Sequence, residues 1–124
     1  MSEIRGGREA AKLRETIAAA EKMAYDFAVG GKIPKPDGPR YARNASNLGE
    51  LGIGLNPQAQ IVGNMLCDEK VYRTCHIAIG ANYDDDAKAL IHLDGLIKNP
   101  TITARTGKRK RVLMKDGELT LGGA

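Results

Sequence analysis

Both histidines of this 124-residue chain lie in segments where apolar residues alternate, together with other groups that could bind a metal. His76 lies in CHIAIG, and His92 lies in IHLD with Asp94 two positions later. Side chains alternate between the faces of a strand, so His92 and Asp94 would share a face. An earlier segment, ELGIGL, places Glu50 on the face opposite Leu51. Two imidazoles and two carboxylates form an N/O set suited to zinc, cobalt, manganese or iron.

The strand faces that carry these groups are otherwise built from glycine and alanine. Gly52 shares the face of Glu50, and Ala78 and Gly80 share the face of His76. A metal and its substrate need volume beside the sheet, which residues without bulk beyond Cβ provide. A histidine that only packs in a core would instead have large apolar neighbours, so we expect open space on these faces.

The elements that must position these groups are a long helix and a series of short strands. Apolar residues recur at steps of three and four over residues 8–29, and two glycines follow at once. A shorter helix is predicted over 40–48, and residues 64–73 are expected to be irregular or briefly helical. Strands are predicted over 50–55, 75–80, 89–97, 101–104, 111–115 and 118–121, with an Asp116–Gly117 hairpin turn. The fold class is α+β: a long N-terminal amphipathic helix followed by a mixed β-sheet carrying the metal-ligand strands, in a single domain over residues 1–124.

Composition is that of a globular protein, with 42% hydrophobic and 27% charged residues. No apolar run is long enough to span a bilayer, and the N-terminus lacks the apolar centre of a signal peptide. We therefore expect a cytoplasmic protein without a membrane partner. A structural disulfide between Cys67 and Cys75 is not expected in that compartment, and Cys75 is interpreted as a small buried hydrophobe.

Two charged runs have alternative interpretations. KRKR at 108–111 resembles a nucleic-acid patch in a chain of net charge +4. It has no aromatic stacking partners nearby and lies between two predicted strands, which favours a solvated turn and no nucleic-acid partner. The run of three aspartates at 84–86 could bind metal, but a solvated turn is again favoured.

Three segments together resemble a known family: NLGELGIGLNPQAQ, DEKVYRTCHIAIG and IHLDGLIKNPTI. They are similar to motifs of the thermophilic metalloaminopeptidases, the group containing aminopeptidases T, S and II. Motif order and approximate gaps match, and EIRGGREAAKLRE is similar to the family's segment ahead of its glutamate. The resemblance covers nearly the whole chain and implies a metalloprotease that removes N-terminal residues from peptides with a dinuclear zinc, cobalt or manganese site.

The resemblance also assigns roles to individual residues. It implies that Glu50 is a carboxylate ligand that bridges two metals, and that His76, His92 and Asp94 are further ligands. Tyr83, seven residues after His76, matches the family's tyrosine that contacts metal or polarises the substrate.

The chain departs from the family's pattern in ways that bear on activity. Family members are longer and carry another glutamate ligand and a catalytic acid/base glutamate ahead of the segments matched here. Gly49 stands where the family usually has alanine, and Arg73 where glycine is common. We therefore expect the C-terminal, metal-binding portion of such an enzyme, completed by a homo-oligomer or a complementary chain. Glu69 is the carboxylate near the ligand strands that could replace the missing base, although it could simply cap a short turn.

Two other functions remain open from the sequence. Relatives of the family include ring-cleaving dioxygenases that act on dihydroxypyridines with one ferrous iron, and His76, His92 and Asp94 would supply their two-histidine, one-carboxylate set. The domain could also be a non-catalytic metal-binding subunit, docking through its amphipathic N-terminal helix.

Overall fold

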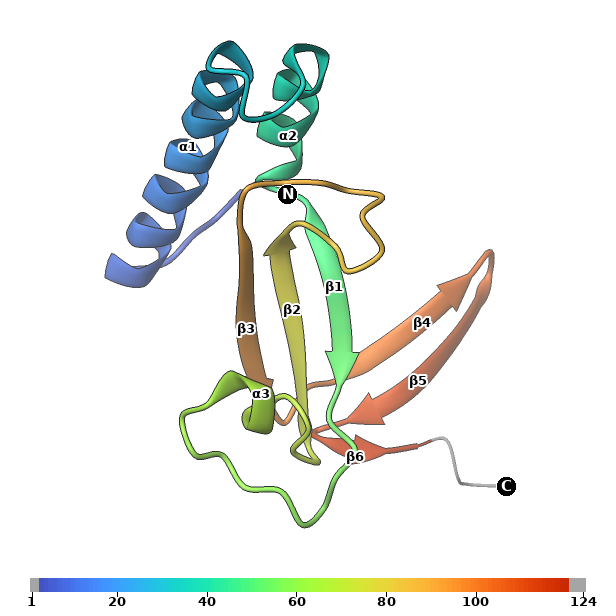
Figure 1. The fold of residues 1–124 in the computed structure, drawn as a ribbon. Coiled ribbons are helices and arrows are strands. Elements are labelled where there is room, and N and C mark those ends of the chain that lie inside the picture. Colours follow the sequence, from blue (N-terminus) through green and yellow to red (C-terminus); the bar gives the residue numbers. More distant parts are fainter. Residues whose placement is uncertain (1–2, 121–124) are drawn as a thin grey trace. The chain divides into compact units, whose positions relative to one another are not determined.

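The protein has a mixed α+β structure in the computed structural model, which describes residues 3–120 (Figure 1). The elements in chain order are α1 (Arg8–Val29), the 3-10 helix η1 (Lys35–Asp37), α2 (Gly38–Asn44), β1 (Leu48–Ile53), α3 (Met65–Asp68), β2 (Thr74–Gly80), β3 (His92–Lys98), β4 (Ile102–Thr106), β5 (Arg109–Lys115) and β6 (Glu118–Leu119). The bounds of α1 are those predicted from its apolar stripe. Among the described helices, none has the length and apolar character needed to cross a membrane.

The strands form two small antiparallel sheets of three strands each, rather than the one mixed sheet expected (Figure 1). The first has the order β1-β2-β3 and the second the order β4-β5-β6. Asp116 and Gly117 have φ angles of 49° and 83° and form the predicted tight turn between β5 and β6. The strand predicted over 118–121 is observed as the shorter β6, which ends at Leu119. Residue 121 of the prediction lies outside the described part of the chain.

Contacts divide the chain into two compact units. One contains the described residues up to Glu50 together with Ala78–Leu93, and the other contains Leu51–Ile77 with the described residues from Asp94 onward. The first three strands contribute residues to both units. The prediction of a single domain stays a prediction.

The first unit is built on the buried face of α1. Its core contains Ile17, Ala20, Ala45 and Ile79. Ala24 is also fully buried, whereas Met23 is exposed, so the apolar stripe continues through the alanine.

Small residues allow α1 and α2 to pack closely. A Cβ added at Gly38 would lie 2.8 Å from the Cβ of Ala28, so a larger residue would push the two helices apart. The second helix begins at Gly38 and ends at Asn44, earlier than predicted, and Pro39 in its first turn suits this early start because its fixed φ is already helical.

Two features stabilise the second unit, a fully buried side chain and a cluster of polar contacts. Met114 of β5 is 0% exposed. The Tyr72 hydroxyl donates to the Glu118 carboxylate at 2.9 Å and accepts from the Leu119 N–H at 3.3 Å, while Arg73 lies 3.3 Å from Glu118. These contacts attach β6 to the segment that precedes β2.

A buried carboxylate holds the long connection between β1 and α3 in place through hydrogen bonds. Asp68, 6% exposed, accepts hydrogen bonds from the backbone N–H groups of Val62 at 2.8 Å and Gly63 at 3.1 Å. Asn64 caps α3 by accepting from the Leu66 N–H at 3.1 Å. The aspartate of the DEK motif is thus a structural residue of this loop.

Two apolar side chains, Leu51 of β1 and Leu55 just after the strand, are not buried. Leu51 is 60% exposed and Leu55 is 59% exposed. No other described residue covers these side chains enough to bury them. Strand periodicity places the two leucines on one face, but it does not tell what packs against that face.

Candidate metal centre

The first contact of the candidate site joins Glu50 of β1 and His92 of β3. The Nε2 atom of His92 lies 3.8 Å from a carboxylate oxygen of Glu50, and both side chains are just over a third exposed. This is too long for a hydrogen bond. It is close to the separation of about 3.4 Å expected for two atoms bound to one tetrahedral zinc at about 2.0–2.2 Å.

The orientation of the His92 ring is set by its other nitrogen. Nδ1 lies 2.7 Å from the backbone carbonyl oxygen of Ala81. A carbonyl only accepts hydrogen bonds, so Nδ1 must donate, and in the neutral imidazole this leaves the lone pair on Nε2, the atom facing Glu50. Ala81 is itself held because its N–H donates to the Ile91 carbonyl at 2.8 Å. A histidine fixed in this way by a backbone carbonyl is typical of metal ligands.

Asp94 supplies the third possible ligand. It follows His92 by two positions in β3, so the two side chains project from the same face of the strand. Glu50, His92 and Asp94 each offer a ligand atom, and these atoms lie within 4.8 Å of one another. One imidazole and two carboxylates suit a divalent ion that accepts nitrogen and oxygen, such as zinc, cobalt or manganese.

His76, the fourth predicted ligand, is not part of this group of three. It lies in the central strand β2 and is 5% exposed. Its Nε2 atom is 3.9 Å from a carboxylate oxygen of Glu69, which is 16% exposed and also forms an ion pair with Lys70. Glu69 is the residue directly after α3, which fits the interpretation that it caps a short turn. It also contacts His76.

The glycines on the ligand faces allow close packing instead of leaving open volume. A Cβ added at Gly52 would lie 1.9 Å from a carbon of the His76 ring, so the imidazole occupies the space above this glycine. A Cβ at Gly54 would lie 1.9 Å from the Val71 carbonyl oxygen. The expected space for a substrate at these two glycines is therefore filled by protein. The sequence could not show this, because the filling groups come from other parts of the chain.

Tyr83, predicted to contact metal or substrate, is 93% exposed in the connection between β2 and β3. The three aspartates that follow it are also exposed, and Lys88 lies 3.9 Å from Asp85. Asp85 has a φ of 62°, as in a tight turn. The exposed turn fits the interpretation of a solvated loop, and the role of Tyr83 stays a prediction.

The two cysteines do not contribute to the group of three ligands. Both are free thiols, which agrees with the absence of a structural disulfide; Cys67 is exposed and Cys75 is buried. Burial raises the pKa of the Cys75 thiol, so it favours the neutral form over a thiolate ligand. The prediction of a small buried hydrophobe at this position is confirmed.

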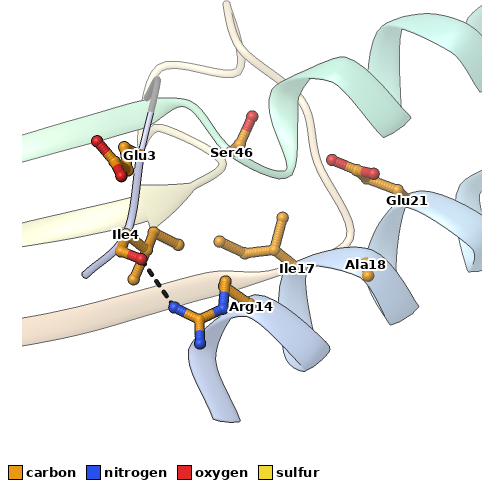
Figure 2. A pocket seen from close by; sticks show the side chains of 7 residues that line it. All are labelled: Glu3, Ile4, Arg14, Ile17, Ala18, Glu21 and Ser46. Atoms are coloured by element: carbon orange, nitrogen blue, oxygen red, sulfur yellow. Dashed lines mark hydrogen bonds between the residues drawn. The ribbon is translucent and has the colours of Figure 1, made fainter. Parts of the chain in front are cut away.

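A cavity of about 390 Å³ lies beside α1 in the first unit, where the sequence suggested no site (Figure 2). Its apolar wall includes Ile4 and Ile17, and Figure 2 shows Arg14 donating to the Ile4 carbonyl oxygen, at 2.7 Å. Two carboxylates, Glu3 and Glu21, also line it. It contains none of the predicted metal ligands, and Glu3 is already paired with an arginine at 2.6 Å.

Comparison of the chain with protein-family models, curated proteins and solved structures finds no match. The likeness to metalloaminopeptidases rests on the motifs themselves.

Proposed function

We propose that this chain holds a divalent metal through Glu50, His92 and Asp94 and is the metal-binding part of a hydrolase that removes N-terminal residues from peptides. The observation that carries the proposal is the fixed His92 ring, whose Nδ1 donates to Ala81 while Nε2 faces the Glu50 carboxylate. A divalent ion bound there would supply the Lewis acidity that amide hydrolysis needs. In this proposal β1 and β3 are the strands that carry the ligands.

The donor set favours a hydrolase over an iron dioxygenase. Ring-cleaving iron enzymes of the kind considered need two histidines and one carboxylate at one ion. The group of three contains one histidine and two carboxylates, because His76 is packed over Gly52 beside Glu69.

Glu69 is the carboxylate we assign to proton transfer. Its contacts with Lys70 and His76 hold the side chain in a mostly buried position. A carboxylate committed to a metal transfers protons poorly, so a separate one is required for the reaction. Tyr83, with its exposed hydroxyl, is proposed to act on the substrate.

A partner is proposed to complete the site. The exposure of Leu51 in β1, and of Leu55 two residues beyond that strand, supports a second copy of the chain as that partner, bound against the face of β1 opposite Glu50. Turnover per chain should then rise with protein concentration.

The test is hydrolysis of aminoacyl anilides by the purified chain with cobalt, zinc or manganese over a range of protein concentrations. We expect slow, metal-dependent turnover that increases with concentration and is lost in His92→Ala and Glu69→Gln. Asp84→Asn, in the exposed loop, is the matched control and should retain activity. Metal binding without turnover at any concentration would support the non-catalytic metal-binding subunit. Cleavage of a dihydroxypyridine with ferrous iron would support the dioxygenase.

A further inference from the structure

The hairpin of β4 and β5 carries a dense positive charge with no counter-charge in its own sequence. Residues 95–115 contain seven Lys and Arg and no Asp or Glu. Five of these cations fall within residues 105–111, where every residue is exposed. No described carboxylate forms an ion pair with any of these five, which are Arg105, Lys108, Arg109, Lys110 and Arg111.

Strand pairing brings like charges together on this hairpin. Arg105 lies directly opposite Lys110 in the antiparallel register, and like charges in that position destabilise a strand pair. None of the carboxylates in residues 3–120 relieves this repulsion by an ion pair. An external polyanion would relieve it.

The other face of the hairpin offers a place for a phosphate. Arg109 and Arg111 are two positions apart in β5 and therefore share a face. Their cross-strand partners are the small residues Thr106 and Ala104. These four residues and Lys110 line a hollow of about 630 Å³. Guanidinium groups bind phosphate oxygens with two parallel hydrogen bonds, and a threonine hydroxyl can add another.

We propose that this hairpin binds double-stranded DNA through its phosphate backbone, which revises the solvated-turn interpretation of the KRKR run. A two-stranded ribbon fits the major groove of B-form DNA. Residues 95–120 contain no aromatic side chain, so the hairpin lacks the stacking platform that single strands require. The turn is Gly107–Lys108, without an apolar side chain that would enter a membrane. This binding is independent of the metal centre.

The test is fluorescence polarisation with a labelled 20-base-pair duplex at about 50–200 mM salt, the range in which phosphate contacts lose affinity steeply. The variant combines Arg109→Gln, Lys110→Gln and Arg111→Gln. The control combines Lys12→Gln, Lys35→Gln and Arg43→Gln, three exposed cations of the helical region. Each set removes three charges, so the net charge falls from +4 to +1 in both.

We expect the hairpin variant to lose at least tenfold in affinity and its salt slope to fall by about 2–3, since each phosphate contact contributes about 0.9. The control should stay within about twofold of the wild type by the same reasoning. Removing like charges should not lower the melting temperature of the variant. A second variant, Arg109→Lys with Arg111→Lys, keeps the charge and should bind several-fold more weakly.

Any of the following results would overturn the proposal. One is the absence of saturable duplex binding at the lowest salt. Another is equal weakening by the hairpin and control sets, which would show a net-charge effect only. The third is tighter binding to a single strand of the same length, or hairpin-dependent binding to phosphatidylserine vesicles without duplex binding.

Discussion

At the level of single residues, Gly52 shows most clearly how the backbone makes room for a large side chain, that of His76. The His76 imidazole lies where a Cβ would be, with a ring carbon only 1.9 Å from that position. Gly52→Ala should therefore force the ring and the strand apart. Gly95 in β3 is a matched control, since its nearest Cβ contact would be an ordinary 3.8 Å to the Ile77 carbonyl oxygen.

We expect Gly52→Ala to lower the free energy of unfolding by about 1–3 kcal/mol, as overpacking does. Gly95→Ala should be neutral or stabilising by roughly 0.5 kcal/mol, because alanine is favoured over glycine inside a strand. Chemical denaturation measures both. Equal effects of the two substitutions would mean that His76 does not occupy the space above Gly52.

The sequence predicted which possible ligands lie together only where the residues are close in the chain. The spacing of His92 and Asp94 on one strand placed both on one face, and both belong to the group of three. The position of His76 beside Glu69 depends on how α3 approaches β2, which no short pattern in either segment determines.

At the level of elements, the loop before α3 depends on one buried carboxylate. Asp68 accepts two backbone hydrogen bonds from the loop, so Asp68→Ala would leave two N–H groups without their acceptor. We expect a loss of roughly 2–4 kcal/mol in the free energy of unfolding, since bonds to a charged acceptor are stronger than neutral ones.

The accompanying readout is amide hydrogen exchange at Val62 and Gly63, which should become much faster in Asp68→Ala. Asp86→Ala, in the exposed loop after β2, is the control and should change neither quantity. If Asp68→Ala left the exchange of both amides unchanged, the carboxylate would not hold the loop.

Element boundaries followed from the sequence where signals were strong and local. The apolar stripe of α1 and the glycines after it predicted Arg8–Val29, and Asp116–Gly117 predicted the last turn. The separation of strands into two sheets was not predictable, since pairing is decided by contacts between residues far apart in the chain.

At the level of the whole molecule, the exposed apolar face of β1 predicts self-association. Leu51 of β1 and Leu55, two residues after the strand ends, are about 60% exposed. Replacing both with serine should reduce the molecular mass in solution, measured by light scattering at about 100 µM, to that of one chain; this prediction follows from loss of the apolar patch.

The control for that measurement is Val29→Ser with Leu66→Ser, two residues that are 81% and 77% exposed on other elements. This pair should leave the mass unchanged. A wild-type protein that is already monomeric at this concentration would contradict the proposed second copy.

The central claim is that Glu50, His92 and Asp94 bind a divalent metal, and calorimetric titration with zinc and manganese tests it most directly. The account predicts saturable binding that weakens at least tenfold in His92→Ala and in Asp94→Asn, with both variants folded by circular dichroism. Asp84→Asn should bind as the wild type does. Binding of equal strength in the wild type and His92→Ala, or none in either, would contradict the account.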